Sequence, residues 1–217
     1  LLRGLGANLP HIDDVTLWAQ HKQGYLDADL VIVPSRHSEL FLQAEGVPNL
    51  AVIPHGIEAI PDQVAPFPEE FTVGYLGGLG PDKGVPYLID AWAELGWEDA
   101  RLIIAGEGSQ QWGPYIQSRA GKGRFCLPGY VPDVAKFYNA ITVYVQPSVT
   151  EGFGIEVIEA MSYGRPVIAS TGAGASNAAG PGHAWRVGPG DAAGLCKAIG
   201  HARELNRTFL HPKGKGP

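Results

Sequence analysis

The sequence is poor in cysteine and methionine and has no long apolar run. A membrane-spanning helix needs about 20 consecutive apolar residues, and no such stretch occurs. Its two cysteines, Cys126 and Cys196, stand far apart without a CxxC motif or a nearby histidine cluster. This spacing favours two buried free thiols over a disulfide or a metal site. No metal is expected.

Positive charge is also scarce. The chain has 16 Lys+Arg against 22 Asp+Glu, and its formal net charge is −6. An acidic chain of this kind argues against binding to a nucleic-acid backbone. Residues 1–14 have no basic region followed by an apolar core, so no signal peptide is expected. Together with the free thiols, this favours a cytoplasmic protein.

An initiator methionine is missing, since the chain opens with Leu1 and its only methionine is Met161. This indicates a processed chain or a fragment of a longer gene product.

Glycine is abundant, with 30 residues among 217, about twice the usual share. The glycines follow no period, which excludes a collagen-like chain. The length fits one domain, or one domain with part of another.

Short apolar runs alternate with helical stretches along most of the chain. Runs such as 102–105 and 143–145 are apolar at every position, which is typical of parallel strands covered by helices on both faces. The fold class predicted is therefore α/β, a Rossmann-like doubly wound parallel sheet. The expected strands are 30–34, 49–54, 71–76, 101–105, 123–127, 142–146, 166–169 and 184–187. The expected helices are 16–25, 36–44, 85–95, 109–120, 134–140, 154–163 and 192–205.

One stretch separates two parts of the chain. Residues 58–70 (EAIPDQVAPFPEE) contain three prolines and read as a linker. Before it, residues 1–57 hold one strand–helix unit and a hinge, which suits the remnant of an N-terminal domain. After it, residues 71–217 suit a nearly complete doubly wound domain.

Glycine-rich turns adjoin four of the expected strands. In an open parallel sheet, ligands bind outside the carboxyl ends of the strands, where glycine lets backbone amides approach a phosphate. None of the four turns completes GxGxxG, and GxxxxGK[ST] is absent. A dinucleotide-dependent dehydrogenase and a P-loop NTPase are therefore disfavoured.

Lys83 follows the first of these glycine-rich turns. It lies directly before Gly84 and the expected helix 85–95. Its ammonium group adds a point charge to the positive end of that helix, which suits binding of a diphosphate.

The run EGFGIEVIE, which starts at Glu151, is the strongest local signal. The amides of Gly154, Ile155 and Glu156 are expected to form an anion-binding helix N-terminus. Glu151 lies in the loop before this helix, and Glu159 lies about one and a half turns inside it. Because phosphate repels carboxylates, these two side chains suit sugar or ribose hydroxyls. The side chain of Glu156 is expected to be exposed.

Five motifs occur in order along the chain: VGYLGGLGPDKG at 73–84, LIIAGEG at 102–108, LPGYV at 127–131, QPSVTEGFGIEVIEAMSYGRPVIA at 146–169 and VGPGD at 187–191. In this order and spacing they closely resemble the C-terminal half of retaining glycosyltransferases of family 4 (glycosyl transferases group 1). Upstream, ADLVIVPS at 28–35 and VIPHGI at 52–57 resemble the end of that family's first domain and the start of its linker.

The resemblance implies a GT-B fold, in which two Rossmann-like domains face a cleft and the C-terminal one holds the nucleotide-sugar donor. It implies a hexosyltransferase of carbohydrate biosynthesis that retains the anomeric configuration and needs no metal or cofactor. The acceptor, whether sugar, lipid or protein, is left open. Peripheral association with the cytoplasmic face of a membrane, through the missing domain, is also left open.

The resemblance also implies roles for individual residues. Lys83 and Glu151 are the expected catalytic residues. Lys83 contacts the donor diphosphate, Glu159 binds the ribose, and Val131 meets the base. The transferred sugar is held by Glu151 with the backbone of Gly152, Phe153 and Gly154, and the distal phosphate by the amides of Ile155 and Glu156.

Two departures from the family pattern keep alternatives open. The family commonly has an arginine five residues before the motif lysine, and here Gly78 stands at that place in the donor site. Most of the first domain is missing as well. A non-catalytic nucleotide-sugar-binding module, or another GT-B enzyme such as a sugar-phosphate synthase, therefore remains an alternative.

Overall fold

The structure is a computed structural model that describes residues 15–58, 60–178 and 184–210. The chain divides into two compact units, 1–55 and 56–217. Each unit is built around its own parallel sheet.

The first unit is small. Its described elements are α1 (Val15–Asp27), β1 (Val31–Val33), α2 (Arg36–Ala44) and β2 (Leu50–Val52). The two strands pair in parallel, and the Ser35 side chain caps α2 by accepting from the Ser38 amide. Val33, Leu42 and Val47 form a small buried core.

The second unit contains a six-stranded sheet. Its strands are β3 (Thr72–Leu76), β4 (Arg101–Ala105), β5 (Arg124–Gly129), β6 (Val143–Gln146), β7 (Val167–Ser170) and β8 (Ala184–Val187). They lie in the order β5-β4-β3-β6-β7-β8, and every neighbouring pair is parallel. This is the doubly wound Rossmann order, in which the connections reverse direction between β3 and β6.

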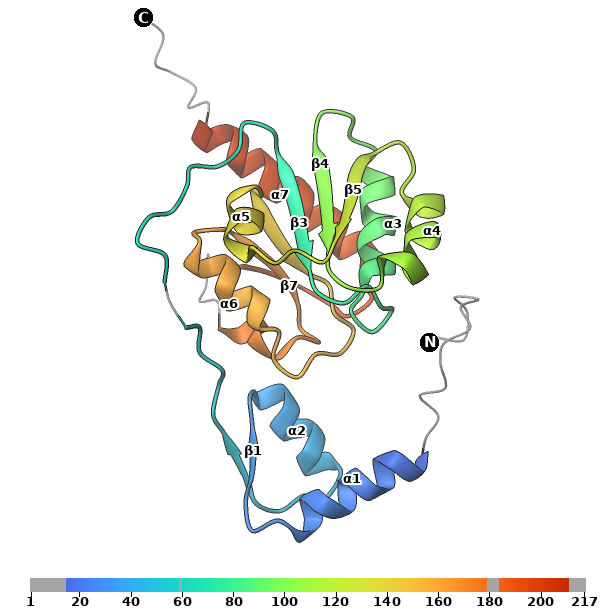
Figure 1. Ribbon diagram of the computed structural model, residues 1–217, viewed down its shortest axis with the longest axis vertical. Helices are drawn as coiled ribbons and strands as arrows, with labels where there is room; N and C mark the ends of the chain where they lie inside the picture. The colour runs from blue at the N-terminus through green and yellow to red at the C-terminus, as the bar shows by residue number, and fades with distance from the viewer. Residues whose placement is uncertain (1–14, 59, 179–183, 211–217) are drawn as a thin grey trace, which may run out of the picture. The chain divides into compact units, whose positions relative to one another are not determined.

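Helices cover both faces of this sheet (Figure 1). One face carries α3, α4 and α7, and the other carries α5 and α6. Their bounds are α3 Val85–Leu95, α4 Ser109–Arg119, α5 Val134–Asn139, α6 Ile155–Ser162 and α7 Ala192–Leu210, with a short 3-10 helix at Gly174–Asn177. The predicted fold class is confirmed.

The central strands are buried on both sides. Ile103 and Ala105 belong to the core beneath α5 and α6, while Leu102 and Ile104 alternate with them and are equally buried. Side chains alternate between the two faces of a strand, so each face of β4 has its own helical layer. This is the physical reason that the apolar runs predicted buried parallel strands correctly.

The predicted elements match the structure, although several bounds differ: α1 ends at Asp27 rather than at residue 25, and β2 spans only Leu50–Val52 of the predicted 49–54. Strand β5 continues past Pro128 to Gly129, the 3-10 helix was not predicted, and α7 continues past residue 205. The described part of 58–70 has no helix or strand. Its later residues nevertheless pack on the sheet domain, since Arg165 donates to the Ala65 carbonyl at 2.6 Å and Glu70 pairs with Arg124 at 2.5 Å.

Candidate functional site

A cleft of about 360 Å³ opens at the carboxyl ends of the central strands. It lies at the point where the strand order reverses, as expected for ligand sites in open α/β sheets. Its walls come from the ends of β3 and β4, the loop after β5 and the start of α6. They are formed by Leu76, Gly77, Gly78, Gly106, Glu107, Tyr130, Val131, Pro132, Val134, Ile155, Glu156 and Glu159.

Lys83 is held next to this region by a tight turn. Gly84 caps α3 with a φ of 74°, and a Cβ at this position would lie 1.9 Å from the Pro147 carbonyl oxygen. Only glycine fits, because an L side chain is both strained there and in collision with backbone. The Lys83 ammonium group forms an ion pair with the Glu151 carboxylate. The two residues predicted to be catalytic are thus in direct contact.

The loop that carries Glu151 is fixed by backbone hydrogen bonds. The Glu151 amide donates to the Gly172 carbonyl at 2.9 Å, and the Gly174 amide donates to the Glu151 carbonyl at 3.1 Å. The Ala175 amide donates to the Phe153 carbonyl. The turn after β7 and the 3-10 helix therefore hold the loop before α6 in one conformation. Sequence reasoning missed this support, although residues 172–174 (GAG) are one of the four glycine-rich turns noted in the sequence.

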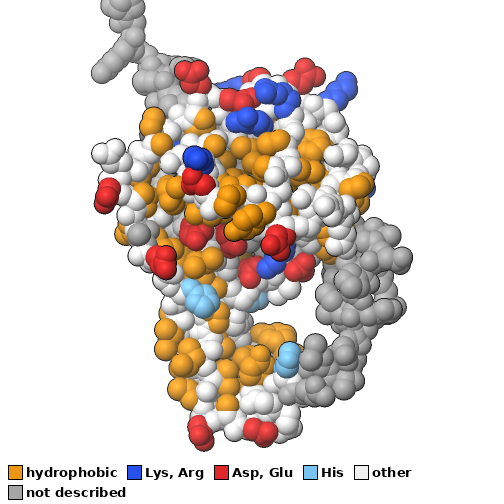
Figure 2. All heavy atoms as spheres, in the orientation of Figure 1, with side chains coloured by type: hydrophobic (Ala, Val, Ile, Leu, Met, Phe, Trp, Pro, Cys, Tyr) orange, Lys and Arg blue, Asp and Glu red, His pale blue; other side chains and the backbone are white. Residues whose placement is uncertain are grey.

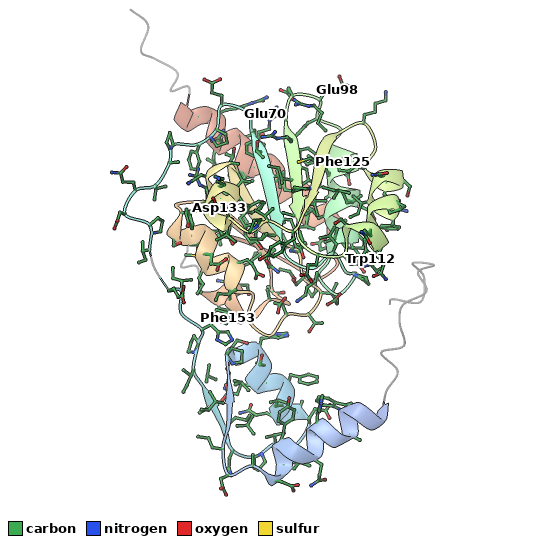
Figure 3. All side chains as sticks on the ribbon, viewed as in Figure 1. Glu70, Glu98, Trp112, Phe125, Asp133 and Phe153 are labelled. Carbon is green, nitrogen blue, oxygen red and sulfur yellow. The ribbon has the colours of Figure 1, made fainter. Side chains whose placement is uncertain are left out.

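Gly154 ends the loop and caps α6. Its φ is 82°, and a Cβ would approach Glu151 Cγ to 3.3 Å. Phe153 is buried in the core beneath the helix, and Gly152 is exposed. Ile155 and Glu156 form the first turn, whose amides have no partner earlier in the helix. Figure 3 labels Phe153 at this end of the sheet and Glu70 at the opposite end.

Glu159 lies inside α6 and lines the cleft. Tyr138 of α5 donates a hydrogen bond from its hydroxyl to Glu159 Oε2 at 2.8 Å. The ring of Tyr138 is completely buried and stacks on Tyr163. Burial, with the nearby Glu159 charge as the next cause, raises the pKa of Tyr138 far above its usual value, so it remains a donor. Nothing in the sequence pattern of α5 distinguished Tyr138 from an ordinary core residue.

Glu156 corrects one expectation. It was predicted to be exposed, but it is half-buried and lines the cleft. Burial raises its pKa, with smaller contributions from Glu151 and Glu159. Glu156 lies three residues before Glu159 and so on the same side of α6. The loop after β3 lies against it, since a Cβ on Gly77 would be 3.9 Å from Glu156 Oε1.

Val131 and Gly78 line the cleft from two different loops. Val131 follows Tyr130 in the loop after β5, and both line the cleft. Gly78 is exposed, and a Cβ there would meet no atom within 4 Å. The Gly78 carbonyl accepts a hydrogen bond of 2.6 Å from the Tyr75 hydroxyl. The place of the family's arginine is therefore open space beside the cleft.

The charge of the cleft is mainly negative. Glu107, Glu156 and Glu159 line it, and the described residues that line it include no Lys or Arg. Lys83, whose charge acts on Glu156, is paired with Glu151. On the face drawn in Figure 2, acidic side chains gather around the lower rim of the larger body, with a basic group among them. Among the described residues, no group of three His, Cys, Asp or Glu side chains is arranged to hold a metal ion.

The described helices include none long and apolar enough to cross a membrane. Cys126 and Cys196 are free, and both are half-buried, although full burial was expected. Burial raises the pKa of both thiols.

Residues 70–204 match the family of glycosyl transferases group 1, which is more than half of the chain. An uncharacterized glycosyltransferase of Methanocaldococcus jannaschii is 34% identical over 152 residues, covering 67% of this chain and 33% of that protein. A D-inositol 3-phosphate glycosyltransferase of Streptomyces bingchenggensis is 31% identical over 203 residues, covering 86% of this chain and 41% of that protein. The chain belongs to the glycosyl transferases group 1 family.

Solved structures agree with this assignment. A sucrose-phosphate synthase from Thermosynechococcus elongatus superposes with a TM-score of 0.74 at 28% identity, covering 92% of this chain and 53% of that one. The Anabaena HepE protein in complex with UDP-glucose superposes with a TM-score of 0.77 at 24% identity, covering 88% of this chain and 59% of that one. The HepE likeness concerns the fold alone. The chain spans between a third and three fifths of the length of these relatives.

Proposed function

We propose that this chain supplies the donor site of a retaining glycosyltransferase of family 4. In that reaction the bond between the anomeric carbon of the donor sugar and the diphosphate oxygen breaks. A new bond forms to an acceptor oxygen, whose proton passes to the departing diphosphate, and the nucleoside diphosphate leaves. The observation that carries the proposal is the contact of Lys83 with Glu151 at the start of α6, beside a cleft lined by Glu159.

Two positive groups would stabilise the leaving diphosphate. The first is the Lys83 ammonium, and the second is the N-terminus of α6, where the amides of Ile155 and Glu156 carry the positive end of the helix dipole. Charge that is already positioned where negative charge develops is worth a few kcal/mol to a transition state. The close fit of Gly84 against Pro147 constrains the backbone next to Lys83.

The ion pair implies an exchange of partners on binding. In the structure Lys83 is paired with Glu151. A bound diphosphate would compete for the ammonium, and Glu151 would then be available to accept hydrogen bonds from hydroxyls of the transferred sugar. Glu159, already oriented by Tyr138, would accept from the ribose hydroxyls, while Val131 would meet the base.

The first test of this proposal is a titration of UDP, GDP and ADP against the purified chain by calorimetry. At least one nucleotide should bind. Lys83→Ala should weaken it about 10- to 100-fold, because a charge-assisted hydrogen bond is worth about 1.5–3 kcal/mol. Glu159→Gln should also weaken it, whereas inorganic pyrophosphate should respond to Lys83→Ala alone. Nucleotide binding that neither variant changes would exclude this site.

A second test isolates the sugar subsite. Glu151→Gln keeps the size of the side chain and removes its charge. It should weaken the preferred nucleotide-sugar more than the corresponding nucleoside diphosphate, since only the former contains the transferred sugar. An equal loss for both ligands would contradict the role proposed for Glu151.

Two other functions fit parts of the same site. A non-catalytic nucleotide-sugar-binding module is favoured by Gly78, which leaves the place of the arginine empty. A sugar-phosphate synthase is favoured by the likeness to the Thermosynechococcus enzyme. Assaying the intact gene product separates them, because a binding module would bind nucleotide-sugar without turnover. A synthase would use a sugar phosphate as acceptor.

A further inference from the structure

A second cavity lies at the opposite end of the same sheet. It has a volume of about 310 Å³ and is bordered by the amino ends of β3, β6 and β7, by β8 and by the last part of α7. Apolar side chains, including Phe67, Phe71, Met161 and Trp185, make up most of its wall. For scale, an engineered apolar cavity of about 150 Å³ binds benzene.

One charged residue lines this apolar cavity. Arg165 precedes β7 and is only 2% exposed. Its Nη2 donates to the Ala65 carbonyl, and its guanidinium lies 5.0 Å from the centre of the Phe67 ring. Nε and Nη1 are buried without a hydrogen-bond partner. Arg165 forms no ion pair with a carboxylate of the described residues.

A buried cation of this kind is costly. Taking a charge out of water is unfavourable unless an opposite charge or hydrogen bonds compensate for it. Burial lowers the pKa of Arg165, which reflects the same cost. Buried donors without partners are uncommon in folded proteins, and each calls for an explanation.

A second polar group in the wall is also unsatisfied. Asn206 of α7 lines the cavity, and its Oδ1 is buried without a partner. Rotating the amide by 180° would present its NH₂ group instead, since the two assignments differ only in the hydrogen bonds that they make. The cavity therefore combines an apolar wall with unused hydrogen-bonding capacity on two elements.

We propose that this cavity is a second binding site, and that its ligand is an apolar molecule with a carboxylate group. The apolar part would fill the space between Phe71, Met161 and Trp185. The carboxylate would accept hydrogen bonds from the guanidinium of Arg165, whose planar array of donors matches carboxylate geometry. The proposal does not depend on the function assigned to the donor cleft, because the two sites share no residue.

Access to Arg165 requires the wall to adjust, because Nε and Nη1 lie beneath its surface. Met161 makes this adjustment inexpensive, since an unbranched thioether side chain readily changes shape. Its flexibility also suits a ligand with a variable apolar part.

The probes for a test are octanoate and 1-octanol, which share an alkyl chain and differ in the head group. Each is titrated against the purified chain by calorimetry. Octanoate should bind about tenfold or more tightly than octanol, because only octanoate forms charge-assisted hydrogen bonds. Acetate, which has the head group alone, should bind far more weakly than octanoate.

Arg165→Met removes the charge and keeps an apolar side chain of similar length, which buried sites often tolerate. This variant should no longer bind octanoate more tightly than octanol, while octanol should still bind. Arg119→Met, which alters an exposed arginine on α4, is the matched control and should keep the preference. Ala202→Phe, which fills the cavity from α7, should weaken both ligands.

Any one of three titration results would overturn the proposal: equal binding of octanoate and octanol to the unaltered chain, no octanoate binding at millimolar concentration, or a preference for octanoate that survives in Arg165→Met. If Arg165→Met does not fold, the comparison of the two ligands on the unaltered chain still decides. Quenching of tryptophan fluorescence by a brominated octanoate, lost in Trp185→Phe, would locate the ligand. Quenching that is unchanged in Trp185→Phe would place it elsewhere and overturn the proposal.

Discussion

The two ends of the six-stranded sheet differ in almost every chemical property, although the same strands run through both. The carboxyl end is built from glycine-rich turns, carboxylates and one lysine, and it forms an open cleft. The cavity at the amino end is lined mostly by aromatic and aliphatic side chains, with the buried Arg165 among them. Within one domain, the direction of the strands separates two kinds of environment.

The difference follows from the geometry of βα units. Every strand in this sheet is parallel, so the helix after a strand begins at the carboxyl end and directs its free amides there. That end therefore attracts anions through backbone groups. The amino end receives the ends of helices and the segment that leads into β3. Recognition at the amino end must therefore come from side chains, as we propose for Arg165.

The largest expected effect concerns the glycine turns of the carboxyl end. Gly84→Ala should destabilise the chain by about 2–4 kcal/mol, because left-handed backbone strain adds to a collision with the Pro147 carbonyl. Gly78→Ala is the matched control and should be nearly neutral, since its Cβ enters open space. Urea unfolding without ligand measures both. Equal stability of the two variants would show that the turn before α3 can relax.

A smaller effect is expected from restoring the arginine that the cleft lacks. Gly78→Arg should strengthen binding of the preferred nucleoside diphosphate about tenfold, because a guanidinium can add a bidentate contact to a phosphate. The control is Gly78→Gln, which adds a long side chain without charge. Calorimetric titration of the nucleoside diphosphate compares the affinities of the two variants. If Gln increases affinity as much as Arg, the gain does not come from charge.

The smallest effect concerns Glu156. Its pKa is raised in the folded chain, so the folded state binds more protons than the unfolded state, and stability is lost as pH rises above the ordinary glutamate pKa. Glu156→Gln should therefore raise the melting temperature slightly at pH 7 and have no such benefit below pH 4. Thermal unfolding across this range tests it. A benefit that does not depend on pH would exclude titration of Glu156 as the cause.

Features of the structure that depend on residues close together in the sequence could be predicted, and features that depend on distant segments could not. The bounds of α2, α3 and β4 followed from apolar patterning alone. The arrangement of Lys83 beside the start of α6 could also be anticipated, because glycine-rich turns and parallel strands bring those residues to one edge. The exposure of Glu156 was predicted wrongly, since it depends on loops that pack over α6 from elsewhere in the chain.

Contacts between distant segments were beyond the reach of sequence reasoning. Tyr138 and Glu159 come from different helices, and only the packing of α5 against α6 brings the hydroxyl within 2.8 Å of the carboxylate. The burial of Arg165 was not predicted either, because the sequence around it indicated only that a strand begins at residue 166. Its contacts with Ala65 and Phe67 arise because the segment before β3 returns to the amino end of β7.

The sequence by itself determined the α/β class, the order of elements and the glycine-rich edge, because these depend on periodicity and on the backbone freedom of glycine. Only the tertiary structure decided which side chains share a site. It paired Lys83 with Glu151, partly buried Glu156 in the wall of the cleft, and enclosed Arg165 in an apolar cavity at the other end of the sheet. Partners and burial depend on packing between segments far apart in the chain, which the local pattern of residues does not record.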